Sequence, residues 1–257
     1  MIYSKALLNK MKSLKKLINI AILIPAYNEE KNIARVIKNC APYQLDMIVV
    51  DDGSKDRTAT VVKKLKQSFK QRLIFLQHPK NKGKGAALKT GFQYVVKRGY
   101  SGVITLDADN QHNTKEIKKF LKMIEREKSD LIIGSRFQNH QGMPFIRLVT
   151  NYTTSWIISW LAGKKIEDVQ SGFRYISSKV IKNIELRTRN FETEPELILK
   201  ACWLNYQVKN IPVSTIYYED SVSQVNKLTD TFKFFRLIAK SLAWRKKIRP
   251  RKNIFID

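Results

Sequence analysis

The sequence has few cysteines and no long apolar run. Cys40 and Cys202 are the only two cysteines among 257 residues, and they form no metal-binding spacing. This scarcity suits a reducing, cytosolic compartment. No apolar segment approaches the ~20 residues that a membrane-spanning helix needs. The strongest candidate, SWIISWLAG at Ser155–Gly163, is too short, and the N-terminus lacks the features of a signal peptide. We therefore expect a cytoplasmic protein that is at most peripheral on a membrane.

Two common phosphate-binding motifs are also missing. No G-x-x-x-x-G-K-[ST] occurs, which excludes a P-loop protein. The segment GKGAAL at Gly83–Leu88 has leucine where a dinucleotide fingerprint has its third glycine, and it follows a polar loop. This loop can still offer backbone N–H groups to a phosphate, or its glycines can simply ease a tight turn.

Acidic residues are scarce compared with basic ones. The chain has 22 Asp and Glu against 48 Lys and Arg, a net charge of +26. Such a charge indicates an anionic partner, which can be nucleic acid, an acidic membrane surface or a phosphorylated small molecule. No helix-turn-helix, zinc-finger or RRM motif is present, so a basic nucleic-acid-binding protein is the disfavoured alternative, and we expect no nucleic-acid partner.

Short β-rich segments alternate with longer helical patterns over the first half of the chain. Alternation of this kind predicts an α/β fold with a Rossmann-like, mostly parallel sheet flanked by helices. The expected strands are Ile20–Ile24, Met47–Val50, Leu73–Leu76, Val103–Leu106 and Leu131–Ile133, and the expected helices are Glu29–Cys40, Asp56–Phe69, Gly85–Lys97 and Thr114–Glu127. Beyond Phe137 the periodicity becomes irregular.

Both ends of the chain carry amphipathic, basic segments. Residues 1–19 repeat apolar side chains at spacings of four, three and four between lysines, as in a helix on a membrane surface or one that packs on the domain. Residues 221–257 combine an apolar stripe from Leu228 to Leu242 with the tail WRKKIRPRK. We expect a central domain over residues 20–220 between these two segments, the second of them on a membrane surface.

Polar residues follow three of the predicted strands. These segments are PAYNEE (Pro25–Glu30), DDGSKDRT (Asp51–Thr58) and DADNQH (Asp107–His112). Ligands of open parallel sheets bind beyond the carboxyl ends of the strands, so we expect the three segments to face one crevice. Asp107 and Asp109 are one residue apart and supply hard oxygen ligands suited to Mg²⁺ or Mn²⁺. A lone D-x-D is also common in polar turns, and we expect His112 to be a surface or capping residue.

These motifs give the chain a resemblance to a known family. ILIPAYNEEKNIARVI, IVVDDGSKDRTATVV, NKGKGAALKTGF, LDADNQH, IIGSRF and DVQSGFRYIS occur in the order seen in family 2 glycosyltransferases. From about Ile20 to Leu237 the chain most resembles the polyprenyl-phosphate sugar transferases, such as dolichyl-phosphate mannosyltransferase. The resemblance implies a GT-A fold and metal-dependent, inverting transfer from a GDP-mannose or UDP-hexose type of donor to a polyprenyl phosphate. The alternative within the family is a saccharide or other hydroxyl acceptor in cell-surface polysaccharide synthesis.

The resemblance also implies roles for individual residues. Those that match donor-binding positions are Pro25, Ala26, Tyr27, Asn28, Glu29, Asp52, Gly53, Lys84, Asp107, Ala108 and Arg136. Asp107 and Asp109 match the metal-binding pair, and Gln111, in preference to His112, matches the amide that joins them. Arg174 is expected to act near the phosphates.

The acceptor decides whether the reaction needs a base. A hydroxyl requires one, whereas a phosphate monoester, with a second pKa of about 6, is already largely dianionic at neutral pH. Asp168 is the preferred candidate for a base or an acceptor-positioning group, and Glu194 is either the second candidate or a turn residue. An anionic membrane surface and a membrane-protein partner would accompany a lipid acceptor. Trp156 and Trp160 suit either a membrane interface or simple core packing.

Overall fold

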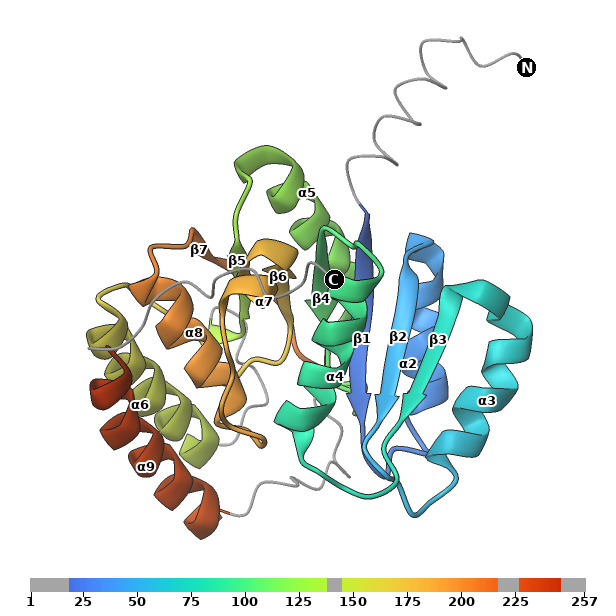
Figure 1. Ribbon diagram of the computed structural model, residues 1–257, viewed down its shortest axis with the longest axis horizontal. Coiled ribbons are helices and arrows are strands. Elements are labelled where there is room, and N and C mark those ends of the chain that lie inside the picture. Colours follow the sequence, from blue (N-terminus) through green and yellow to red (C-terminus); the bar gives the residue numbers. More distant parts are fainter. Residues whose placement is uncertain (1–18, 138–144, 217–226, 246–257) are drawn as a thin grey trace, which may run out of the picture.

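The computed structural model describes residues 19–137, 145–216 and 227–245. Within these ranges seven strands form one sheet, in the order β3-β2-β1-β4-β6-β5-β7 (Figure 1). The strands are β1 (Ile20–Ala26), β2 (Asp46–Asp51), β3 (Leu73–Gln77), β4 (Gly102–Thr105), β5 (Leu131–Ser135), β6 (Arg174–Ser177) and β7 (Val208–Pro212). The five strands expected from the sequence are confirmed, and β6 and β7 are additional.

The sheet is parallel except at β6, which runs antiparallel to both β4 and β5. β1 lies between β2 and β4, so the segments that follow these three strands meet where the strands end. We call this carboxyl end of the parallel strands the edge of the sheet. Because β6 runs the other way, its first residue, Arg174, pairs with Thr105 at the end of β4. The reversal brings the start of β6 to the edge where its neighbours end.

Helices cover both faces of the sheet. The helices are α2 (Ile33–Cys40), α3 (Thr58–Phe69), α4 (Lys84–Lys97), α5 (Ile117–Glu127), α6 (Phe145–Ala162), α7 (Ser178–Asn183), α8 (Thr193–Trp203) and α9 (Lys227–Arg245), with short 3₁₀ turns at Ala41–Tyr43, Lys70–Arg72 and Thr114–Glu116. Along β1, Ala21 and Leu23 face the core under α4 and α8, whereas Ile22 and Ile24 face the core under α2 and α5. Strands covered on both faces are apolar throughout, as the sequence shows.

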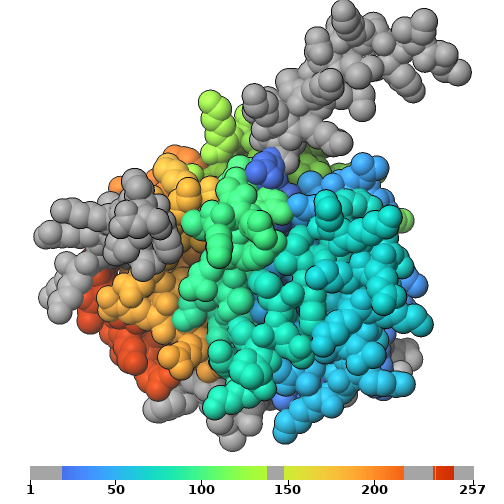
Figure 2. All heavy atoms as spheres, turned by 45° about the vertical axis from the view of Figure 1, so that its right-hand side comes forward, coloured from blue at the N-terminus to red at the C-terminus, as the bar shows by residue number. Residues whose placement is uncertain are grey.

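The first two expected helices begin later than their periodicity predicts. Asn28 has a φ of 55°, in the left-handed region that asparagine tolerates, so the chain turns after β1 and α2 begins only at Ile33. Of the residues 1–19, only Asn19 lies within the described ranges. The C-terminal apolar stripe falls on α9, which contacts α8 (Figure 2), and its Phe234 and Ile238 pack against the core cluster to which α8 contributes.

Helix α8 is buried on all sides, which explains why no amphipathic pattern marked it in the sequence. Its residues from Thr193 to Cys202 are all buried. Glu196 accepts hydrogen bonds from the backbone N–H groups of Arg187 (2.9 Å) and Thr188 (2.9 Å) and pairs with Lys200. These bonds hold the preceding loop on the helix and keep a buried charge compensated.

Helix α6 exposes aromatic side chains. Trp156 and Trp160 are 71% and 74% exposed, so the core-packing alternative for them is wrong. In the part of the chain that the structure describes, no helix is both long enough and apolar enough to cross a bilayer.

The Glu196 cluster gives a stability prediction. We expect Glu196→Ala to lower the free energy of unfolding by about 3 kcal/mol or more, because it leaves the Lys200 ammonium buried and removes the acceptor of two N–H groups. Glu185→Ala is the matched control, since that carboxylate is 61% exposed and its pairing with Arg187 is weak. Urea titration should show a change below about 0.5 kcal/mol for the control; equal effects of the two substitutions would contradict the role assigned to Glu196.

Candidate active site

Hydrogen bonds join the segments that follow β1 and β2. The backbone N–H of Asn28 donates to Ser54 Oγ (2.9 Å), and Lys55 N–H donates back to Asn28 Oδ1 (2.8 Å). One residue on, Glu29 N–H donates to Thr58 Oγ1 (2.8 Å). The predicted neighbourhood of these two motifs is therefore present, and together they form one wall of the site.

Asp107 and Asp109 follow β4 at the same edge. Asp107 Oδ1 lies 2.7 Å from Lys84 Nζ, and its Oδ2 lies 3.2 Å from His112 Nε2. Asp109 Oδ1 accepts a hydrogen bond from the backbone N–H of Gln111 (3.0 Å). Asn110, which lies between these two residues, has a left-handed φ of 62°. This turn fixes both carboxylates at the strand end.

The two aspartates differ in charge environment. Burial raises the pKa of Asp107, but Lys84 and His112 outweigh burial and hold that pKa well below its usual range. Burial and the charge of Asp107 raise the pKa of Asp109. Burial also raises the pKa of Glu29, and the two aspartates add to that shift. The edge therefore holds an excess of negative charge that a further cation would relieve.

Lys84 is the first residue of α4 and links two acidic groups. Its ammonium lies 2.7 Å from Asp107 Oδ1 and 3.4 Å from Glu194 Oε1. Burial lowers the pKa of Lys84, but the two carboxylates outweigh burial and raise it. The residue that the sequence placed near the nucleotide thus sits in the centre of the acidic edge.

Asp52 organises the loop before α4. Its carboxylate accepts hydrogen bonds from Lys82 N–H (3.0 Å) and Gly83 N–H (2.7 Å), and its Oδ1 lies 2.6 Å from His78 Nδ1. Gly83 has a φ of 96°, which L side chains rarely adopt. The donor-binding role expected of Asp52 stays a prediction; in the structure its carboxylate holds the loop that presents Lys84.

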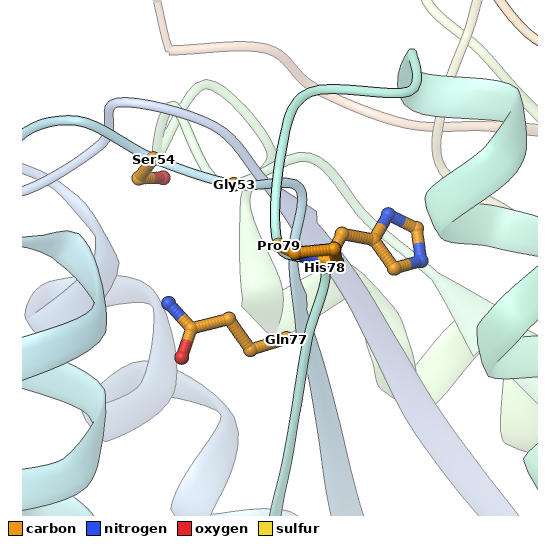
Figure 3. Close-up of a pocket in the computed structure, with 5 residues that line it drawn as sticks. All are labelled: Gly53, Ser54, Gln77, His78 and Pro79. Atoms are coloured by element: carbon orange, nitrogen blue, oxygen red, sulfur yellow. The ribbon is translucent and has the colours of Figure 1, made fainter.

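A cavity of about 400 Å³ lies beside this loop, at the ends of β2 and β3 (Figure 3). It is lined by Gly53, Ser54, Gln77, His78 and Pro79. Gly53 is one of the residues expected at the donor site, whereas Gln77 and His78 were not singled out from the sequence. The sequence pattern that could have identified them is two polar residues directly after an apolar strand, the same pattern that marked the other strand ends.

Other expected donor-site residues lie at the same edge. Pro25 and Ala26 are the last two residues of β1, and Tyr27 follows in the turn. Ala108 is buried between the two aspartates. Gly172 lies directly beside Asp107: a Cβ there would come within 2.7 Å of the Asp107 carboxyl carbon, so only glycine leaves that carboxylate in place.

Asp168 and Arg136 form a two-pronged ion pair. Arg136 Nε and Nη2 lie 2.6 and 2.9 Å from the two carboxylate oxygens of Asp168, which is completely buried. Burial raises the pKa of Asp168, but Arg136 outweighs burial and lowers it. A carboxylate held in this way is a weak base, so of the two roles considered for Asp168 the geometry favours positioning.

Arg174 is buried, with only 1% of the residue exposed. Its Nη2 donates to Val169 O (2.6 Å) and lies 4.0 Å from Glu194 Oε1. Within the part of the chain that the structure describes, its Nε and Nη1 have no hydrogen-bond partner, and burial lowers its pKa. Buried donors left unpaired are costly, which favours an anionic ligand near this arginine. Glu194 lies between Arg174 and Lys84, so it too is paired with cations.

His112 differs from its prediction. Only 5% of it is exposed, its ring packs against Phe173 and its Nε2 contacts Asp107, so it is neither a surface residue nor a cap. Its neighbour Gln111 stays partly exposed beside Asp109. The expectation that Gln111 is the third metal group remains a prediction.

The carboxylates at this edge suit a hard divalent cation that takes its remaining ligands from outside the protein. Among the described residues, no group of three or more His, Cys, Asp or Glu side chains is arranged to hold a metal ion. Mg²⁺ commonly takes one or two carboxylates and completes its shell with substrate phosphates and water. The deprotonated Asp107 and its neighbour Asp109 fit a metal that arrives with a diphosphate.

The Arg136–Asp168 pair predicts a pH dependence. The folded-state pKa of Asp168 is below its unfolded value of about 3.9, so the pair stabilises the fold above that pH and loses this contribution as the pH falls through the folded pKa. We expect Asp168→Asn to lower the free energy of unfolding by about 3 kcal/mol at pH 7 and by progressively less below about pH 4. Denaturant titrations across pH measure this. Glu167→Gln, a partly exposed neighbour, should change little at any pH; a deficit of Asp168→Asn that is constant with pH would contradict the pairing.

The chain is similar to several characterised proteins. It is 34% identical to the UDP-N-acetylglucosamine–dolichyl-phosphate N-acetylglucosaminyltransferase of Methanococcus voltae, over 85% of this chain and 94% of that protein. It is 29% identical to the polyprenol monophosphomannose synthase of Mycolicibacterium smegmatis, over 80% of each chain.

Among solved structures, glucosyl-3-phosphoglycerate synthase from Mycobacterium tuberculosis, in complex with Mn²⁺, uridine diphosphate and glucosyl-3-phosphoglycerate, superposes with a TM-score of 0.68 at 15% identity. It covers 97% of this chain and 87% of its own. The similarity confirms the GT-A fold. The model of the family described as Glycosyl transferase family 2 matches residues 21–184. The chain therefore belongs to glycosyl transferase family 2 and is a glycosyltransferase.

Proposed function

We propose that this enzyme transfers a sugar from a nucleotide-sugar to the phosphate of a polyprenyl phosphate, with a divalent Mg²⁺ or Mn²⁺ at the donor. The Methanococcus relative is named for transfer to dolichyl phosphate, and the Mycolicibacterium relative for synthesis of polyprenol monophosphomannose, which supports this choice. The donor would be of the GDP-mannose or UDP-hexose type.

One observation carries the choice of acceptor: both candidate bases are paired with cations. Asp168 is held by Arg136 through two contacts, and Glu194 lies between Lys84 and Arg174. A hydroxyl acceptor needs a carboxylate free to take its proton. A phosphate monoester is largely dianionic near neutral pH and attacks without a base. The site is therefore better suited to a phosphate acceptor.

The donor is proposed to lie along the edge of the sheet. Its nucleoside would occupy the cavity beside Gly53 and Gln77, and its diphosphate would reach Asp107 and Asp109. These two aspartates, joined by Gln111, would hold the metal, which supplies positive charge to the departing diphosphate. Lys84, Arg136 and Arg174 would add fixed positive charge around the same phosphates.

The transfer balances without a proton donor. An oxygen of the acceptor phosphate forms a bond to the anomeric carbon of the sugar, while the bond from that carbon to the β-phosphate oxygen breaks. The electron pair leaves with the nucleoside diphosphate, and attack from the opposite side inverts the anomeric centre. Arginine donors suit both phosphate groups because their planar N–H pairs match phosphate oxygens.

The enzyme is proposed to act peripherally on the cytoplasmic face of a membrane. A net charge of +26 attracts the chain to anionic lipid headgroups, where a polyprenyl phosphate exposes its phosphate. The basic segments 1–19 and 221–257 would add to this attraction, and a membrane-protein partner would complement it.

Product analysis tests the proposal directly. Purified enzyme is incubated with radiolabelled UDP- and GDP-sugars, Mn²⁺ and either polyprenyl phosphate or a panel of saccharides. We expect label in a lipid-phosphate product, with no transfer to saccharides. Label in saccharides alone would instead establish the hydroxyl-acceptor alternative and refute the proposal.

Asp107→Asn and Asp109→Asn test the metal-binding pair. Each removes one anionic ligand, so we expect kcat/KM to fall by about 10²-fold or more, measured as initial rates at several Mn²⁺ concentrations. Asp130→Asn makes the same chemical change at the opposite edge of the sheet, where the carboxylate contacts Gln207 N–H, and should retain activity. Near-normal rates in both active-site variants would refute the metal role.

Lys84→Met tests whether this ammonium opposes the metal in the free enzyme. The ammonium lies 2.7 Å from Asp107 Oδ1, so a cation at Asp107 must displace or repel it. We expect Mn²⁺ to bind the nucleotide-free variant about tenfold more tightly than wild type, measured by electron paramagnetic resonance of free Mn²⁺. Lys97→Met removes the same charge at the other end of α4 and should not change the affinity. Weaker Mn²⁺ binding in Lys84→Met would contradict the expectation.

A further inference from the structure

The outer face of α6 exposes four large apolar side chains in one stripe. Val149, Tyr152, Trp156 and Trp160 follow each other at spacings of three, four and four, which places them on one side of a helix. Their exposed fractions are 46%, 50%, 71% and 74%. Figure 1 shows α6 at the rim of the molecule, on the side away from α3. A contiguous apolar surface of this kind marks an interaction site.

We infer that this α6 stripe is the surface with which the enzyme lies on the lipid bilayer that holds its acceptor. The inference rests on the proposed lipid-phosphate acceptor. Tryptophan and tyrosine favour the headgroup level of a bilayer, because their rings are apolar with one polar edge. A helix that lies in the membrane plane needs no spanning length. The stripe has both properties.

Charge favours a bilayer over a protein partner. Helix α6 contains no acidic residue, its one charged residue is Arg147, and the exposed Lys164 and Lys165 follow it. Anionic headgroups complement such a helix. A second copy of the chain is a poorer fit, since four side chains cover roughly a few hundred Å² and a stable interface buries about 800 Å² per partner.

The inner face of α6 connects the stripe with the arginine site. Ser155 Oγ accepts the N–H of Val169 (3.1 Å), and the carbonyl of Val169 accepts from Arg174. The adjacent Asp168 holds Arg136. An α-helix with its side chains is about 10–12 Å across. With its outer face on the bilayer, α6 would hold both arginines about one helix diameter from the headgroups, within reach of a lipid phosphate.

Vesicle flotation tests the inference. Wild type and a Trp156→Ser/Trp160→Ser variant are mixed with vesicles of phosphatidylcholine and phosphatidylglycerol, and the bound fraction is measured. We expect the variant to partition about tenfold less, with unchanged thermal stability because both positions are exposed. We also expect it to lose transfer to polyprenyl phosphate embedded in vesicles and to keep transfer to a short-chain, detergent-soluble polyprenyl phosphate.

Tryptophan fluorescence supplies a matched control, because two of the four tryptophans lie in the α6 stripe and two lie elsewhere. A Trp203→Phe/Trp244→Phe variant retains the α6 pair and should be quenched by brominated lipids. A Trp156→Phe/Trp160→Phe/Trp244→Phe variant retains only Trp203, whose indole N–H donates to Leu161 O (2.9 Å), and should be quenched much less. Equal quenching of the two, or unchanged flotation of the serine variant, would overturn the inference.

Two further outcomes separate the competing explanations. If the serine variant alters the oligomeric state in sedimentation and leaves flotation unchanged, the stripe is an interface between copies and the inference fails. If wild type floats with vesicles but transfers sugar to no lipid phosphate, the proposed function fails while the membrane contact stands.

Discussion

Charge compensation at one edge of the sheet is the constraint on which the site depends. Asp107, Asp109 and Glu194 bring carboxylates together in a partly buried region, where like charges repel strongly. Lys84 and Arg174 offset that repulsion from α4 and β6. Removing either side of this balance leaves buried charge without a partner.

The fold supplies the balancing groups through strand direction. The parallel strands β1, β2 and β4 end at the edge and deliver loops rich in carboxylates and amides. The antiparallel β6 begins there and delivers Arg174 beside the last residue of β4. A wholly parallel sheet would have carried the start of that strand to the opposite edge. The single reversal therefore joins the cationic half of the site to the acidic half.

Much of the first half could be predicted from the sequence, because its strands are apolar on both faces and its helices are amphipathic. Asp107 and Asp109 were found because they directly follow such a strand. The second half could not be predicted in the same way. Helix α8 is buried on every side and α6 exposes tryptophans, so neither shows the usual division into an apolar and a polar face.

Contacts between distant segments account for the features that the sequence did not show. His112 looked like a surface residue because the sequence does not show that Phe173, on another segment, packs against its ring. Asp168 was assigned two possible roles because its pairing with Arg136 spans 32 residues. Asp52 holds the backbone of a loop about 30 residues further on, a contact that the sequence did not show. Such pairings depend on topology, which local patterns do not encode.

Calorimetric titration of the enzyme with UDP and with GDP, in Mn²⁺ and in EDTA, tests the central claim most directly. The central claim is that the group of carboxylates and cations around Asp107 binds a nucleoside diphosphate together with a divalent metal. We expect at least one nucleotide to bind in Mn²⁺, and we expect EDTA to weaken this binding by about tenfold or more. Equal affinity with and without the metal would contradict it.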